Sequence, residues 1–195
     1  MNNPSSTFNE ILDCARALII GGGYNGFSYA DISEFVGIRK ASIHHHFPTK
    51  VDLVRTLVER YREEAEAGIA ALERYHSDPA DQLRAYIGYW LGCVGDVTKG
   101  YCVCALLATQ IPVLPQDIVL EVRAHFLALS AWITSVLERG AKQGAFALSS
   151  DACSEAETFM ATVHGAMLSA RAYGDPKMFG VITGPLLDRL VIQKD

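Results

Sequence analysis

The segment 27–53 reads FSYADISEFVGIRKASIHHHFPTKVDL, and its pattern decides the fold. Apolar residues recur at helical spacing in two short runs, at about 29–36 and 40–47. Gly37 separates the two runs and Pro48 ends the second. Because glycine permits the positive φ that a sharp reversal often requires, the segment predicts two short helices joined by a tight turn. This arrangement is a helix-turn-helix.

The rest of the chain is also helical in its hydrophobic period. An upstream helix runs from about Phe8 to the glycines 21–23, and a long helix follows the motif at about 50–75. Further helices are predicted at about 80–97, 101–110, 116–142, 150–173 and 176–191. No run shows the sustained alternation of a strand. We therefore expect an all-α protein, with a three-helix domain containing the helix-turn-helix at 1–49 and a connecting helix plus a larger helical domain at 50–195.

Composition fits a globular protein, but the charge at first opposes nucleic-acid binding. The chain has 195 residues, half of them hydrophobic and a fifth charged, and a net charge of −5. Residues 1–60 hold six basic and six acidic residues, whereas 61–195 hold eleven and sixteen, so the second segment carries all of the net charge. Residues 37–50 hold three cations, three histidines and no acid. The segment with the helix-turn-helix is therefore locally positive.

The sequence favours a cytoplasmic protein with free thiols. The first ten residues lack the basic and apolar regions of a secretory signal. We expect no membrane partner, because by this interpretation no apolar stretch approaches the roughly 18–20 residues that span a bilayer. The chain has five cysteines, an odd number, and we expect it to lie inside the cell, so a disulfide framework is not expected.

The second helix of the motif has an outer side suited to a DNA groove. The apolar residues that pack the motif are predicted to be Ile32, Val36, Ile38, Ile43 and Phe47. This leaves Lys40, Ala41, Ser42, His44 and His45 facing outward. Small residues near the start of the helix permit a close approach to base edges, and the ammonium, hydroxyl and imidazole groups supply hydrogen bonds.

These residues resemble the DNA-binding domain of the TetR/AcrR family of bacterial repressors. The residues that match the family motif are Gly37, Ile38, Ala41, Ser42, Ile43, His46, Phe47, Lys50 and Leu53. The match extends over about residues 8–55, and the rest of the chain agrees with the family in length and helicity. The resemblance implies a regulator that binds double-stranded DNA.

The resemblance also assigns roles within the motif. Lys40, Ala41, Ser42 and His44 fall where the family reads bases. Tyr29, His45, His46 and Lys50 fall where it touches phosphates or braces the motif. The family most often has tyrosine at the position of His44. An imidazole is shorter than a phenol and titrates near neutrality, so this contact and its pH dependence differ from the family pattern.

Two other patterns allow different interpretations. Three consecutive histidines can suggest a metal site, but the His-rich signal is usually longer than three residues, and on a helix such neighbours cannot all face one ion. We therefore expect no metal and no other cofactor. The segment 101–116, YCVCALLATQIPVLPQ, loosely resembles an electrophile-sensing branch of the family. It offers Cys102 and Cys104 as an alternative, thiol-based sensor of electrophiles or oxidants. Inert core thiols are the competing interpretation, because apolar residues surround both cysteines.

Aromatic and polar-tipped residues beyond the motif predict a pocket for a small effector, although they equally suit a core. The candidate ligand-binding residues are Tyr86, Tyr89, Trp90, Cys93, Tyr101, Cys102, His125, Phe126, Met160 and His164. The sequence contains no recognisable catalytic motif, so an enzyme, like a purely structural protein, is a remote alternative.

The resemblance implies a homodimer that binds a palindromic operator as a repressor and is released by the effector. The family pairs its last long helices, which here means 116–142, or 150–173 with 176–191. One face of 150–173 is rich in small residues and suits such packing: Ala156, Phe159, Met160, Val163, Ala166, Met167 and Ala170. A core role for this face is the alternative.

Overall fold

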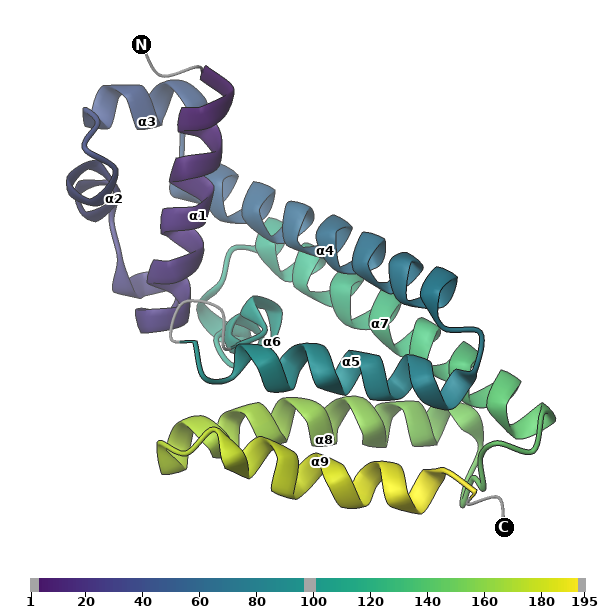
Figure 1. The fold of residues 1–195 in the computed structure, drawn as a ribbon. Helices are drawn as coiled ribbons and strands as arrows, with labels where there is room; N and C mark the ends of the chain where they lie inside the picture. The colour runs from purple at the N-terminus through teal and green to yellow at the C-terminus, as the bar shows by residue number, and fades with distance from the viewer. Residues whose placement is uncertain (1–3, 97–100, 193–195) are drawn as a thin grey trace. The chain divides into compact units, whose positions relative to one another are not determined.

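A computed structural model describes residues 4–96 and 101–192, and the described chain is almost entirely helical (Figure 1). The helices are α1 (Pro4–Gly22), α2 (Tyr29–Val36), α3 (Lys40–His46), α4 (Lys50–Tyr75), α5 (Pro79–Cys93), α6 (Val103–Ala108), α7 (Gln116–Lys142), α8 (Ala152–Tyr173) and α9 (Lys177–Leu190). Two 3-10 turns are η1 (Tyr24–Gly26) and η2 (Ile111–Val113). Within these residues the extended pairing is a single bridge between Phe146 and Val191. The predicted all-α class is confirmed.

The chain forms two compact units. The first contains the chain up to Glu63 together with Tyr101–His125, and the second contains the remainder. Helices α4 and α7 each contribute residues to both units, because the divisions fall inside them. The first unit therefore contains the helix-turn-helix and a later segment that includes α6. The domain division at residues 49 and 50 stays a prediction.

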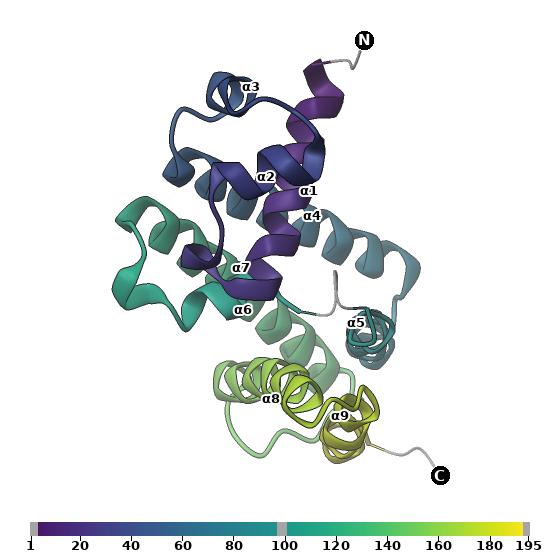
Figure 2. The same ribbon diagram turned by 90° about the vertical axis from the view of Figure 1, so that its left-hand side faces the viewer.

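The first unit has a core built from α1, α2, α3 and the beginning of α4 (Figures 1 and 2). Ile11 of α1, Ile32 of α2, Ile43 of α3 and Leu53 of α4 are all fully buried. Burying an aliphatic side chain of this size contributes roughly 1.5–3 kcal/mol. The small motif is thus held by helices on both sides of it in the sequence.

The second unit contains α5, α8, α9 and the later part of α7. Helices α8 and α9 lie side by side as a hairpin, which Figure 2 shows almost end-on. Gly174 ends α8 in the left-handed conformation, with φ 63°, and its amide donates to the carbonyls of Ala170 and Arg171. The small-residue face predicted on 150–173 is at most 7% exposed at every position, so within one chain it belongs to the core.

Helix α7 corrects one expectation. It has 27 residues and is long and apolar enough to cross a membrane by length and composition, so the statement that no stretch approaches that length is wrong. The apolar residues of α7 are interspersed with a few charged ones, so the helix contains no continuous apolar run of that length. Leu129, Ile133, Val136 and Leu137 are buried, so this helix supplies core residues.

Several helix boundaries differ from prediction; α1 begins at Pro4, four residues before the predicted start at Phe8. Helix α5 ends at Cys93, and the last predicted residue, Val97, lies outside the described residues. Helix α6 begins at Val103 because Cys102 is its N-cap, with backbone ψ 115° and its sulfur accepting from the amide of Ala105. The predicted start at Tyr101 was therefore two residues early.

Candidate nucleic-acid interface

Helix α2 has only eight residues, and local hydrogen bonds define both of its ends. The Asp31 carboxylate accepts from the amide and hydroxyl of Ser28, at 2.6 and 2.8 Å, while the Ser28 hydroxyl accepts from Ala30. These bonds from Ser28 lower the Asp31 pKa. Gly37 ends the helix with φ 72°. A capping box and a left-handed glycine compensate for the low intrinsic stability of so short a helix.

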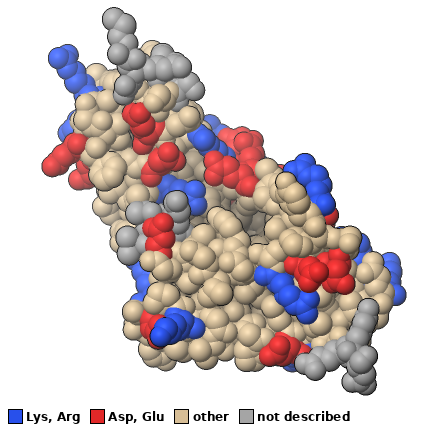
Figure 3. Space-filling view, viewed as in Figure 1, with Lys and Arg blue, Asp and Glu red and all other residues tan. Residues whose placement is uncertain are grey.

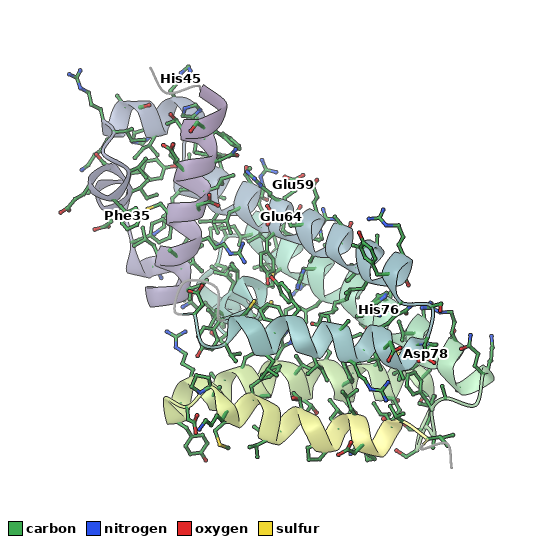
Figure 4. The ribbon with its side chains drawn as sticks, viewed as in Figure 1. Phe35, His45, Glu59, Glu64, His76 and Asp78 are labelled. Atoms are coloured by element: carbon green, nitrogen blue, oxygen red, sulfur yellow. The ribbon has the colours of Figure 1, made fainter. Side chains whose placement is uncertain are left out.

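The turn fixes α3 against α2. The Ser33 hydroxyl donates to the carbonyl of Ile38 at 2.6 Å, which connects the end of α2 to the turn. Ile43 is fully buried, so the opposite side of α3 faces outward. Lys40, Ala41, His44 and His45 are exposed there, and Ser42 is half-buried. Figure 4 labels His45 at this end of the unit, and Figure 3 shows basic side chains projecting beside it.

His44 is oriented by two contacts. Its Nδ1 lies 3.1 Å from the carbonyl oxygen of Pro48, so this nitrogen is the donor of the pair. Its ring meets the ring of Tyr29 edge-on, with centroids 4.8 Å apart. In the neutral ring with a proton on Nδ1, Nε2 is an acceptor. His44 can therefore accept a hydrogen bond from a base amino group in this form.

Tyr29 braces the motif. Its hydroxyl donates to the carbonyl of Phe47 at 2.9 Å, which connects the start of α2 to the end of α3. Burial, with smaller effects of Asp52 and Tyr24, raises the pKa of Tyr29 to about 12. The phenol is therefore a neutral donor at physiological pH, and its position suits bracing better than a phosphate contact.

Lys50 also turns inward. Its ammonium donates to the carbonyl of Phe27 and lies 4.0 Å from the centroid of the Phe27 ring and 4.8 Å from that of Tyr24. Burial lowers the pKa of Lys50. Of the two roles that sequence reasoning left open, phosphate contact or brace, these contacts favour the brace. Its partners are the residues that lead into α2.

The three consecutive histidines have different surroundings. His44 contacts Tyr29 and Pro48, and His45 is exposed. His46 is half-buried, with its ring centroid 6.1 Å from that of Phe8 in α1. His46 therefore contributes to the packing of α3 against α1, while the other two lie on the outer side.

Gln110, which the sequence analysis did not single out, connects the segment that follows α6 to Tyr24, a residue that precedes α2. The side-chain oxygen of Gln110 accepts from the amide of Tyr24 at 2.8 Å, across 86 positions of sequence. Gly23 has φ 73°, and a Cβ built there would lie 2.0 Å from Nε2 of Gln110. The glycine run 21–23 was interpreted only as a helix stop. Its last member is also the point at which a distant side chain approaches the backbone.

The cysteines of the α6 segment are buried in the first unit. The sulfur of Cys102 lies 3.7 Å from Nε2 of His125, and Cys102 and Cys104 are at most 1% exposed. Hydrogen bonding with Cys102, followed by burial, raises the pKa of the Cys104 thiol well above its usual value. The thiol-sensor alternative gains no support, because a protonated, buried thiol is a poor nucleophile. Cys102 precedes α6 as its N-cap and Cys104 lies within the helix, so the two thiols are not both residues of one helix.

The predicted ligand-binding residues fall in two places. Tyr101, Cys102 and His125 belong to the first unit. Tyr86, Trp90, Cys93, Phe126, Met160 and His164 belong to the second unit, as does Tyr89, which is 56% exposed. Ring contacts connect Tyr86 with Trp132, which was not in the predicted set, and Phe126 with His164. The structure thus supports an aromatic cluster within the second unit.

Comparisons with known proteins agree with this arrangement. The family model described as "Bacterial regulatory proteins, tetR family" matches residues 11–57, and "Tetracyclin repressor-like, C-terminal domain" matches 79–183. No curated protein matches the chain.

Solved structures extend the similarity over almost the whole chain. A TetR-family transcriptional regulator from Agrobacterium tumefaciens is 66% identical, with a TM-score of 0.95, and the match covers 97% of this chain and 100% of that one. A TetR regulator from Legionella pneumophila is 26% identical, with a TM-score of 0.85 and coverage of 97% and 98%. A regulator from Saccharomonospora viridis in complex with choline is 22% identical, with a TM-score of 0.83 and coverage of 97% and 100%, which shows the fold alone. This chain belongs to the TetR family of bacterial transcriptional regulators.

Proposed function

We propose that this regulator is a repressor that binds a palindromic operator as a homodimer in the cytoplasm and leaves it when a small effector binds. The observation that carries the proposal is the polar outer side of α3, exposed while the opposite side is fully buried at Ile43. A helix held in this way can enter the major groove, where base edges differ in their hydrogen-bonding pattern.

The proposal divides the motif residues by where their polar groups lie. Lys40, Ala41, Ser42 and His44 would meet base edges, and His45 is exposed where a phosphate contact is possible. The polar groups of Tyr29 and Lys50 are used within the motif. They would position α3 without touching DNA.

Pairing of two chains is supported by apolar side chains on α8 and α9. Leu168 of α8 is 60% exposed and Val181 of α9 is 61% exposed, and Tyr173 at the end of α8 is 73% exposed. Large apolar side chains exposed on neighbouring elements commonly mark an interaction site. A two-fold dimer would present two α3 helices to half-sites about 34–36 Å apart.

Release by an effector is supported by helix continuity. Helix α4 passes from one unit to the other after Glu63, and α7 does so after His125. A ligand bound among α5, α7 and α8 would therefore contact α7, a helix that continues into the first unit. If the α3 helix of one subunit no longer fits its half-site, contacts with base edges worth roughly 1–3 kcal/mol each are lost. A small displacement of that helix therefore suffices for release.

The test is DNA binding by the full chain, measured by fluorescence anisotropy against the DNA that flanks its own gene. We expect specific binding that weakens steeply with salt. His44→Ala should weaken the specific site more than random DNA. Arg74→Ala, at an exposed arginine in the last turn of α4 and outside both the motif and the proposed pairing surface, is the control and should leave binding unchanged. A chain that ignores duplex DNA even at low salt would contradict the proposal.

A further inference from the structure

The buried polar side chains of the second unit are largely paired. Gln82 accepts from Arg139 at 2.6 Å and donates to a backbone carbonyl at 2.7 Å. Glu155 accepts from the Ser149 hydroxyl at 2.6 Å, and the Thr183 hydroxyl donates to the carbonyl of its own helix. Hydrogen-bonded buried polar groups are the rule in native proteins, so a cluster of exceptions requires an explanation.

Three ring nitrogens of the second unit are the exceptions among the residues described. They are Nε1 of Trp90, Nε1 of Trp132 and Nε2 of His164, and each is buried with no hydrogen-bond partner within the described chain. Trp90 is 6% exposed and Trp132 is 8% exposed. The three residues come from α5, α7 and α8, so the lack of hydrogen-bond partners is not a property of one helix.

Ring contacts bring these helices together at two neighbouring levels. The Tyr86 ring lies 5.5 Å from that of Trp132 and 6.3 Å from that of Phe159, which defines the first level. The second is defined by the 5.3 Å contact between the rings of Phe126 and His164.

The directions of the helices place Trp90 at the second level. In Figure 1, α5 and α8 run in the same direction, and α7 runs the opposite way. Trp90 follows Tyr86 by about 6 Å along α5, and His164 follows Phe159 by about 7.5 Å along α8. Both steps lead to the same end of the unit. Phe126 precedes Trp132 on α7, so it lies toward that end as well.

The chemistry of these atoms restricts what can bind there. An indole N–H only donates, so a partner must offer an acceptor to each tryptophan, whereas His164 can donate or accept. Aromatic rings form the surroundings. No Lys or Arg among the described residues of the second unit is buried, so an anion would find no compensating charge. An uncharged molecule fits better than a carboxylate.

We propose that the effector is an uncharged, largely apolar molecule whose oxygen acceptor, such as an aromatic ketone, receives hydrogen bonds from Trp90 and Trp132. This inference rests on the proposed effector-released function and names the ligand class. The apolar body packs on Tyr86, Phe126 and Phe159, and His164 provides a third polar contact.

The chain is suited to a direct test, because Trp90 and Trp132 are its only tryptophans. The full-length protein labelled with ¹⁵N gives two indole N–H signals, assigned by Trp90→Phe and Trp132→Phe. Acetophenone is the probe, and ethylbenzene is its matched control without an acceptor. We expect acetophenone to move both indole proton signals downfield and ethylbenzene to move neither in that direction. Benzoate and tetramethylammonium should bind more weakly than acetophenone.

Calorimetry with the variants supplies the second measurement. Each Trp→Phe variant should weaken acetophenone binding by about 3–10-fold, the loss expected for one hydrogen bond, and should leave ethylbenzene binding unchanged. Tyr75→Phe, at a ring that is 82% exposed at the end of α4 and outside the proposed site, is the control and should change neither. Equal binding of both probes, tighter binding of tetramethylammonium, or no binding of acetophenone at millimolar concentration would each overturn the proposal.

The two proposals fail separately. Ligand binding is measured on the free protein, and operator binding is measured by anisotropy without ligand. A chain that binds its operator but not acetophenone refutes the ligand class alone. A chain that binds acetophenone through its tryptophans but ignores DNA refutes the proposed function and leaves the site standing.

Discussion

Replacing Lys50 with methionine tests whether this residue braces the motif or contacts DNA. Methionine keeps an unbranched apolar side chain and removes the ammonium that donates to the Phe27 carbonyl and lies over the Phe27 and Tyr24 rings. A hydrogen bond from a charged group is worth roughly 1.5–3 kcal/mol and a cation–π contact roughly 0.5–1 kcal/mol. Burial, which lowers the Lys50 pKa, offsets part of this gain. We expect Lys50→Met to lower the free energy of unfolding by about 1–2 kcal/mol.

The assay combines urea unfolding with anisotropy titrations at several salt concentrations. Lys50→Met should weaken operator binding while the slope of log K against log salt stays at the wild-type value. Lys40→Met removes an exposed ammonium from the outer side of α3, and if this group meets a phosphate the slope should fall by about 0.9. A Lys50→Met protein with wild-type stability and a slope reduced by about 0.9 would refute the assignment of Lys50 as a brace.

Three further predictions follow from the described contacts. Gly23→Ala should lower stability in urea by about 1–3 kcal/mol, because φ 73° is strained for alanine and its Cβ meets the Gln110 side chain; an unchanged midpoint would contradict this. Hydrogen bonds lower the Glu155 pKa below 4.5 in the folded state, so its stabilisation is present above pH 4.5 and is lost as pH falls through the folded pKa. The free energy of unfolding of Glu155→Gln should therefore fall less steeply at acid pH than that of the wild type. If both proteins lose stability equally as pH falls, Glu155 does not have this role. Iodoacetamide should label exposed Cys153 before buried Cys104 in mass spectrometry, whereas the reverse order would show that the α6 thiols are accessible.

The helix-turn-helix was predictable because its determinants are local. Ser28 and Asp31 lie three residues apart and cap α2, and Gly37 adopts the positive φ that its position in the turn suggested. Hydrophobic period predicted the inward side of α3 for the same reason, since Ile43 and Phe47 are four residues apart and both are buried. These features depend on short-range spacing and intrinsic backbone preference.

The orientation of Lys50, the role of Gln110 and the aromatic cluster of the second unit depend on contacts that residue spacing does not reveal. The family pattern includes Lys50, but only the position of the Phe27 carbonyl and the Tyr24 ring shows that its ammonium turns inward. Gln110 lies 86 positions from Tyr24, and no periodicity connects them. The candidate ligand residues were chosen by type, so residues of both units were combined in one set and Trp132 was left out.

The contact between Gln110 and Tyr24 limits how freely this regulator can be recombined. A transplant of residues 4–63 onto another sensor domain would leave the Tyr24 amide without its acceptor and would uncover the α1 surface that α6 contacts. A chimaera that also retains residues 101–113 keeps both. We expect the larger graft to protect the Tyr24 amide from hydrogen exchange and the smaller one to lose that protection. The DNA-binding unit of this chain therefore cannot be transferred as residues 4–63 alone. Part of the unit is encoded about forty residues further along the sequence, from Tyr101 onward.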